Sequence, residues 1–183
     1  MPTLHIYPQP DLPAIFKWQA IAFMRTAWSD IFQGDNLYVS ETFPPENQPV
    51  HFALAEGESL ISYAAILEFS LNHCGNTYRG YGLGNMFTFP PFRKQGYGSQ
   101  VLQAATRFIQ TSTADIGILF CHPTLEPFYA AQGWQTTASQ TRLGQPDHFQ
   151  VYDSSRMMLF ISEKGLANQK DFDRQPIYVD WPW

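Results

Sequence analysis

Long cationic runs and long apolar runs are both missing from this sequence of 183 residues. Lys and Arg number 11 against 16 Asp and Glu, which gives a formal net charge of −5. Because no basic run is present to follow a phosphate backbone, we expect no nucleic-acid partner. No apolar run approaches the roughly 20 residues that span a bilayer, and the N-terminus lacks the basic region and apolar core of a signal peptide. We therefore expect a cytoplasmic protein with no membrane partner and, from the acidic balance, a preference for a cationic substrate.

Cysteine is scarce, with only Cys74 and Cys121. Two cysteines in apolar or strand-like surroundings favour a reduced intracellular pair over a disulfide framework. Cys121 ends an apolar stretch, which is typical of a buried strand cysteine and not of a nucleophile. The five histidines show no ligand spacing, so we expect no metal site.

Charged residues are also few, at 15%, whereas aromatic residues reach 16%. That aromatic content excludes a disordered chain. The length predicts one domain over residues 1–183, without internal repeats or low-complexity segments.

The order of hydrophobic patterns predicts an α/β fold. Asp11 and Pro13 are expected to start a helix that runs to about Trp28, with Ile15, Trp18 and Ala22 along one side. Polar, proline-rich residues 29–50 and polar residues 140–150 are expected to be loops, and the former is long enough to suggest a function. Strands are predicted over 3–7, 50–55, 59–71, 77–89, 116–121 and 156–161, and further helices over 99–110 and 125–132, the last one closed by Gly133.

Three alternate glycines, Gly80, Gly82 and Gly84, lie on one face of the predicted strand 77–89. Missing side chains there permit a bulge or the close approach of another group. The strand leads into a loop with the pattern Arg-x-x-Gly-x-Gly, which opens onto a helix N-terminus. Backbone N–H groups at a helix start, together with Arg93 and Lys94, predict a cradle for a pyrophosphate.

A second pattern, Phe-Tyr-x-x-x-Gly-Trp, covers residues 128–134. With the glycine loop at its observed separation, this chain resembles the GNAT acyltransferase superfamily over roughly residues 50–135. The order of segments, including Tyr81-Gly82-Leu83-Gly84 and a chain ending in aromatic residues, looks most like the aminoglycoside 2′-N-acetyltransferases. The resemblance implies a GNAT-like fold, in which helices flank a central, mixed, mostly antiparallel twisted sheet of about six or seven strands.

The resemblance also implies acetyl-CoA as cofactor, bound by a core of about residues 76–135. The loop would hold the pyrophosphate, and the backbone of Met86–Thr88 would pair with the pantetheine arm and polarise the thioester carbonyl. Tyr129 matches the family's general acid, because a phenol with a pKa near 10 is protonated at neutral pH. The cofactor-binding residues so implied are Met86, Phe87, Thr88, Arg93, Lys94, Gln95, Gly96, Tyr97, Gly98, Ser99 and Phe128.

The general base is where this sequence departs from the related aminoglycoside enzymes. Gly84 stands where those enzymes carry a glutamate. Glu68, His122 and a chain of water molecules remain as alternatives, and we take His122 as the candidate catalytic residue because of its intrinsic pKa. A histidine in a turn before proline is, however, more often a residue that bonds the backbone.

The expected acceptor is a primary amine of a small molecule, and a homodimer remains open. Asp30 and Asp35 in the long loop are expected to meet a cationic amine. The segment 162–183 is expected to dock near the acceptor site, where Asp180 and the terminal carboxylate of Trp183 would contribute. Leaving aromatic residues of this segment in water would be unfavourable.

Two classes of function follow. The first is an acetyl-CoA-dependent N-acetyltransferase, and the second is a non-catalytic, CoA-binding sensor or scaffold, which the missing glutamate permits. A flavin- or nucleotide-binding protein would leave the Phe-Tyr-x-x-x-Gly-Trp pattern unexplained.

Overall fold

The computed structural model describes all residues 1–183, and the chain divides into two compact units. The first unit comprises Met1–Leu67 and Asn85–Ala105, and the second comprises Glu68–Gly84 and Thr106–Trp183. Three elements pass from one unit into the other: strand β3 (Ser59–His73), strand β4 (Asn76–Thr88) and helix α2 (Tyr97–Gln110).

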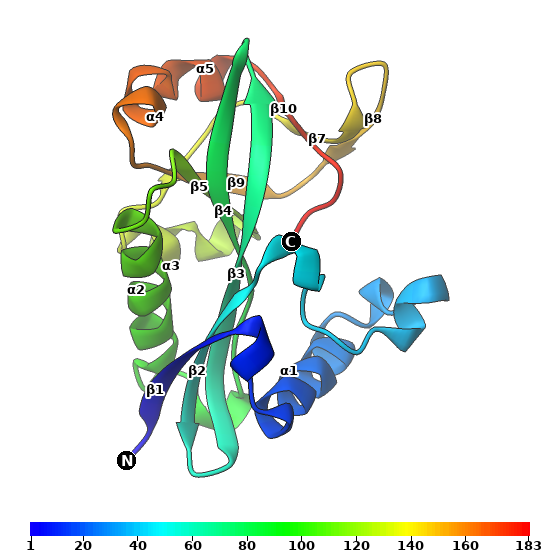
Figure 1. Cartoon of the computed structure of the whole chain (residues 1–183), viewed down its shortest axis with the longest axis vertical. Coiled ribbons are helices and arrows are strands. Elements are labelled where there is room, and N and C mark those ends of the chain that lie inside the picture. Colours follow the sequence, from blue (N-terminus) through cyan, green and yellow to red (C-terminus); the bar gives the residue numbers. More distant parts are fainter. The chain divides into compact units, whose positions relative to one another are not determined.

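Seven strands are hydrogen-bonded in the order β1-β2-β3-β4-β5-β9-β6 (Figure 1). The pairs β1–β2, β2–β3, β5–β9 and β6–β9 are antiparallel, whereas β4 and β5 run parallel over Gly80–Leu83. This mixed, mostly antiparallel sheet confirms the predicted fold class. The remaining strands of this sheet are β1 (Thr3–Pro8), β2 (Val50–Glu56), β5 (Ile116–Cys121), β6 (Gln135–Thr136) and β9 (Ser155–Phe160).

In the first unit, helix α1 (Ala14–Ala27) lies close to its predicted bounds, but two details differ. Its N-cap is Pro13 without any side-chain cap, and Asp11 belongs to a preceding 3-10 turn, η1 (Gln9–Asp11). The predicted face was also wrong. The buried positions are Phe16, Ala20, Ile21 and Met24, whereas Ile15 and Trp18 are 47% and 51% exposed.

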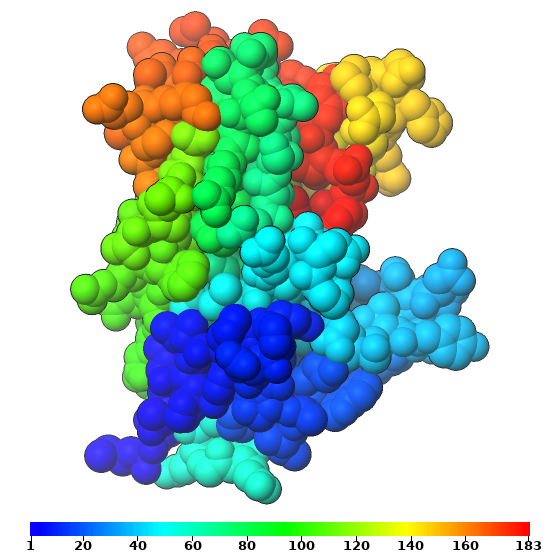
Figure 2. Space-filling model, in the orientation of Figure 1, coloured from blue at the N-terminus to red at the C-terminus, as the bar shows by residue number.

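The loop after α1 carries three short 3-10 helices, in agreement with the prediction of a long loop with little regular structure. They are η2 (Ser29–Ile31), η3 (Gly34–Tyr38) and η4 (Pro45–Asn47). Figure 2 shows η2 and η3, in light blue, at the surface. No residue of these three helices is buried.

In the second unit, the predicted polar loop 140–150 is instead a hairpin. Strands β7 (Thr141–Gln145) and β8 (His148–Tyr152) pair antiparallel, and β10 (Ile177–Val179) pairs parallel with β7. Arg142 lies over the ring of Phe149, 4.2 Å from its centroid, and over Tyr178. Backbone pairing and this stacking hold the hairpin, and β8 is exposed over most of its length, so β8 lacks the apolar alternation of a half-buried strand.

The segment after β9 also contains two short helices that the sequence analysis left out, α4 (Glu163–Ala167) and α5 (Gln169–Arg174). Arg156 of β9 is 2% exposed and anchors this region, because its Nη2 donates to the carbonyl of Phe172 at 2.6 Å and its Nε to Thr137 Oγ1 at 2.7 Å. Burial lowers the pKa of Arg156 to about 10, so the guanidinium remains charged at neutral pH.

Candidate active site

The loop between β4 and α2 has the geometry of an anion cradle. Residues 90–92 form a 3-10 turn, η5 (Pro90–Phe92), after which Lys94 and Gly96 adopt left-handed conformations, with φ of 62° and 83°. The first backbone bond of the helix runs from the Gln100 N–H to the Gly96 carbonyl at 3.1 Å. The N–H groups of Tyr97, Gly98 and Ser99 therefore have no acceptor within the helix.

These N–H groups lie at the positive end of the helix dipole, where an anion is stabilised. A Cβ atom added at Gly96 would meet nothing within 4 Å, so the space beside the loop is open. Arg93, Lys94 and Gln95 are exposed, and Arg93 is fixed by a bond from its Nε to the Thr88 carbonyl at 3.0 Å. The residues present thus fit a pyrophosphate.

The strand segment before this loop has an irregular backbone and one buried side chain. Asn85 is left-handed with φ of 51°, and Phe87 is 6% exposed. The Phe87 ring stacks on Phe23 of α1, with 4.2 Å between centroids, and on Tyr63 at 5.4 Å. The Phe87 side chain is therefore part of the core of the first unit, and only its backbone is left for a role in binding a cofactor.

In the second unit, the Phe-Tyr-x-x-x-Gly-Trp pattern forms a 3-10 turn, η6 (Pro123–Leu125), and helix α3 (Glu126–Ala130). Gly133 is left-handed with φ of 88°, as the prediction of a closing glycine requires. Trp134 is 2% exposed, and its Nε1–H donates to Thr106 Oγ1 at 2.9 Å. This pairing fixes the C-terminal end of the pattern.

Tyr129 is 7% exposed, and the ring of Phe128 packs edge-on against it at 5.1 Å. Burial, and secondarily the nearby Cys121 thiol, raise the pKa of Tyr129 well above its usual value. The phenol therefore carries its proton across the whole neutral range, as a general acid must at the start of a reaction.

The residues that the sequence offered as bases are held by other contacts. His122 is exposed, and its Nδ1 accepts a bond from the Thr124 N–H at 3.4 Å, so it caps the turn η6 as a backbone-bonding histidine does. Glu68 accepts bonds from Arg79 Nη2 at 3.2 Å and from Tyr81 at 2.9 Å.

Cys121 is buried, and burial together with Glu126 raises the pKa of its thiol to about 11. That pKa leaves almost no thiolate at neutral pH, which agrees with the interpretation of Cys121 as a structural residue. Both cysteines are free. No group of three or more His, Cys, Asp or Glu is arranged to hold a metal ion.

The residues predicted for the acceptor are distributed over both units. Asp30 and Asp35 are exposed on η2 and η3 of the first unit. In the second unit, Asp180 is exposed and accepts a bond from Gln145 Nε2 at 3.3 Å. Trp183 stacks on Phe69 with 4.9 Å between centroids and donates from Nε1 to the Ile118 carbonyl at 3.2 Å.

A buried polar network in the first unit was not singled out by the sequence analysis. His51 of β2 and Tyr63 of β3 are both completely buried, and His51 Nδ1 lies 2.6 Å from the Tyr63 hydroxyl. Thr42 and Gln9 extend the network on either side. The sequence could have indicated this network only through a histidine in a predicted strand. The partners of that histidine, Tyr63 and Gln9, are 12 and 42 residues away in the sequence, so no local pattern connects them.

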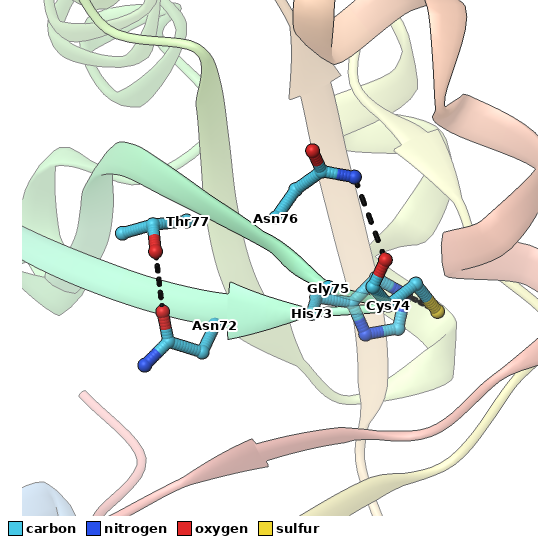
Figure 3. A pocket seen from close by; sticks show the side chains of 6 residues that line it. All are labelled: Asn72, His73, Cys74, Gly75, Asn76 and Thr77. Atoms are coloured by element: carbon cyan, nitrogen blue, oxygen red, sulfur yellow. Dashed lines mark hydrogen bonds between the residues drawn. The ribbon is translucent and has the colours of Figure 1, made fainter.

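A separate hollow of about 350 Å³ lies at the β3–β4 turn of the second unit and is lined by residues 72–77 (Figure 3). His73 Nε2 and Cys74 Sγ are 3.5 Å apart there, and Thr77 donates to Asn72 Oδ1 at 2.6 Å. None of the residues predicted for the active site line this hollow.

No helix of the chain combines the length and apolar character needed to cross a membrane. No curated protein sequence matches the chain. Among solved structures, ElaA of Escherichia coli is similar with a TM-score of 0.62 at 14% identity, covering 86% of this chain and 99% of ElaA. An aminoglycoside 6′-N-acetyltransferase complexed with coenzyme A is similar with a TM-score of 0.59 at 11% identity, over 86% of this chain and 97% of that enzyme.

A protein of Enterococcus faecalis V583, described as a probable N-acyltransferase, is similar with a TM-score of 0.57 at 18% identity, over 76% of this chain. The match covers only 33% of that longer protein. These likenesses show the fold. The family model described as the acetyltransferase (GNAT) domain matches residues 10–137, which include the anion cradle and the Phe-Tyr-x-x-x-Gly-Trp pattern. The chain therefore belongs to the GNAT acetyltransferases, whose cofactor is acetyl-CoA.

Proposed function

We propose that this protein is an acetyl-CoA-dependent N-acetyltransferase that acts on a primary amine of a small molecule. The observation that carries the proposal is the cradle at residues 93–99, with two left-handed residues ahead of an open helix N-terminus, inside the region that the family model matches. The cofactor supplies an acetyl thioester. The chain's own residues bind its phosphates, orient the amine and handle protons.

We assign the following roles to individual residues, as the resemblance implies and as their surroundings support. Arg93, Lys94 and the N–H groups of residues 97–99 bind the pyrophosphate. The backbone of Met86–Thr88 orients the pantetheine arm. Tyr129, kept protonated by burial, gives its proton to the departing thiolate.

On the acceptor side, the exposed carboxylates of Asp30 and Asp35 would attract a cationic amine, as would Asp180 and the terminal carboxylate of Trp183. Such carboxylates favour a charged, hydrophilic acceptor over an apolar one. Aminoglycosides are charged, hydrophilic amines of this kind, and they are the first amines to test.

A second candidate function is a CoA-binding module without catalysis, and the observation that favours it is Gly84 in place of the family's glutamate. Thiol release from acetyl-CoA, measured against a panel of amines, separates the two. The enzyme predicts amine-dependent release, and Tyr129→Phe is expected to lower kcat about 100-fold or more while CoA binding stays the same. If CoA binds but no amine is acetylated, the enzyme proposal fails.

The cradle is tested by CoA binding alone. Gly96→Glu places a carboxylate at the anion site and strains a left-handed position, so the Kd for CoA is expected to rise at least about tenfold, equivalent to ~1.4 kcal/mol. Gly96→Asn is the matched control, because asparagine tolerates the left-handed conformation without adding charge. Equal CoA affinity of the Glu and Asn variants would place the pyrophosphate elsewhere.

A further inference from the structure

We propose that Asn85 is a positioning residue for the cofactor. Its side chain, bonded to the carbonyl of Thr42, holds the left-handed backbone from which Met86–Thr88 is offered to the pantetheine arm of CoA. The inference rests on the proposed function, because it concerns the binding of the same cofactor. It gives a side chain a role in a segment that otherwise contributes through its backbone alone.

The backbone of β4 is irregular at Asn85. Strand β4 pairs with β5 over Gly80–Leu83, and Asn85, which follows this paired stretch, has φ of 51°. Few side chains adopt this left-handed conformation, and asparagine is among those that tolerate it. Such a conformation persists where surrounding contacts fix it, and it occurs preferentially at functional sites. The contacts of the Asn85 side chain are therefore expected to keep this backbone in place.

The Asn85 side chain reaches a segment that lies 43 residues away in the sequence. Its Nδ2 donates to the Thr42 carbonyl at 2.8 Å. Thr42 is 5% exposed, so water has little access to this carbonyl if the amide is removed. A buried carbonyl without a donor is unfavourable, and the backbone at one end of the bond would have to move. The bond therefore stabilises the conformation of both segments.

The Thr42 end of this bond is itself held by side chains from other elements. Glu41 accepts from Lys17 Nζ of α1 at 2.6 Å and from Gln9 Nε2 of η1 at 2.5 Å. The Tyr63 hydroxyl of β3 donates to Thr42 Oγ1 at 3.2 Å. Glu41 and Thr42 thus form an anchor to which the Asn85 side chain is attached.

Strand β4 is fixed again on the other side of Met86. The Ser62 hydroxyl of β3 donates to the Phe87 carbonyl at 2.8 Å, and the Phe87 ring stacks on Tyr63. The half-buried Met86 lies between this point and Asn85, so contacts on both sides set the orientation of its backbone. A segment that is already oriented loses less entropy when a ligand binds. Loss of the Asn85 contact should therefore weaken the binding of the pantetheine arm.

The test measures the binding of two probes to the full chain by isothermal titration calorimetry. The first probe is CoA, and the second is adenosine 3′-phosphate 5′-diphosphate, which is CoA without its pantetheine arm. Asn85→Asp keeps the shape of the side chain but cannot donate, whereas Asn85→Gly keeps the left-handed conformation and loses the side chain. Both variants are expected to raise the Kd for CoA at least about fivefold, with unchanged binding of the second probe.

Asn168→Asp is the matched control. Asn168 Nδ2 also donates to a backbone carbonyl, that of Lys164 at 2.9 Å, but it lies outside residues 10–137, which the family model matches. This variant should bind both probes as the wild type does. Wild-type affinity for CoA in both Asn85 variants would overturn the role of Asn85. An equal loss of affinity for both probes would also overturn it, because a general defect of the fold weakens both.

A double-mutant cycle tests whether Asn85 acts through the anchor. Glu41→Ala removes the bonds from Lys17 and Gln9 and leaves β4 unchanged, so it should raise the Kd for CoA in the wild-type background. In the Asn85→Gly background the connection is already broken, and Glu41→Ala should have no further effect. Additive effects would show that Asn85 does not act through its bond to this segment, which contradicts the proposal.

These readouts separate the role of Asn85 from the proposed function. If the wild type binds neither probe, both proposals fail together. If the wild type binds CoA and the Asn85 variants bind it equally well, only the role of Asn85 fails. If the variants lose affinity for CoA alone but the wild type acetylates no amine, the role of Asn85 stands and the enzyme proposal fails.

Discussion

At the scale of single residues, His51 links stability to pH. Its pKa of about 4 in the folded protein lies below the ordinary value of 6.5, because burial disfavours the charged ring. The unfolded chain therefore binds the extra proton between these pH values. This contribution is fully present above pH 6.5 and is lost as the pH falls toward 4, by about 3 kcal/mol in total.

We expect the free energy of unfolding, measured with urea, to fall between pH 7 and pH 4.5 in the wild type. The same free energy should depend less steeply on pH in His51→Gln. His148→Gln, which changes an exposed histidine, should keep the wild-type slope. Identical slopes in the wild type and His51→Gln would mean that His51 is not the group that titrates.

Residue-scale features of the site were only partly predictable. The closing Gly133 was predicted from a local pattern, because a helix C-terminus often imposes a left-handed glycine there, whereas the left-handed conformation of Gly96 was not predicted. The partners of His51 follow from no local pattern, since Gln9 and Tyr63 come from distant parts of the sequence and meet it only when the strands pair.

At the scale of elements, strands were predicted correctly where burial gives their sequence a recognisable apolar pattern. An exposed strand has no such pattern and was missed. Strands β2, β3 and β5 are buried over most of their length and were located from apolar runs. Strand β8 is exposed over four of its five residues, so its sequence resembles a loop. In α1, apolar residues occur on more than one side, and their spacing therefore did not determine which face is buried.

The alternate glycines of β4 give an element-scale prediction. A Cβ atom at Gly82 would lie 2.4 Å from the Trp183 ring, and one at Gly80 would lie 2.3 Å from Phe69, so these glycines make room for two aromatic rings. Gly82→Ala should displace Trp183 and destabilise the protein by about 1–3 kcal/mol, measured by urea unfolding.

The double variant provides the control for this pair. In the Trp183→Ala background the clash is gone, so Gly82→Ala should be neutral or slightly stabilising, because alanine restricts the unfolded chain. A double-mutant cycle should then give a coupling of at least about 1 kcal/mol between the two positions. Additive effects would show that Trp183 does not pack on Gly82 in solution.

At the scale of the whole molecule, the distribution of charge bears on the choice of acceptor. The net charge of −5 and the exposed carboxylates Asp30 and Asp35 create a negative potential that raises the local concentration of cationic amines. Such steering acts over distances comparable to the Debye length, about 10 Å at 0.1 M salt, and weakens as salt is added.

We therefore expect kcat/KM for a polycationic amine to fall about five- to tenfold as NaCl rises from about 20 mM to about 500 mM, while an amine with one charge shows a smaller decline. Asp30→Asn with Asp35→Asn should reduce the salt dependence for the polycation without altering CoA binding, because both positions lie outside the cradle. If kcat/KM did not depend on salt, or if its salt dependence were the same in the double variant as in the wild type, electrostatic attraction by these residues would not contribute to acceptor recognition. The acceptor would then have to be selected by shape, with the exposed apolar residues Leu37 and Tyr38 of the same loop as the first positions to substitute.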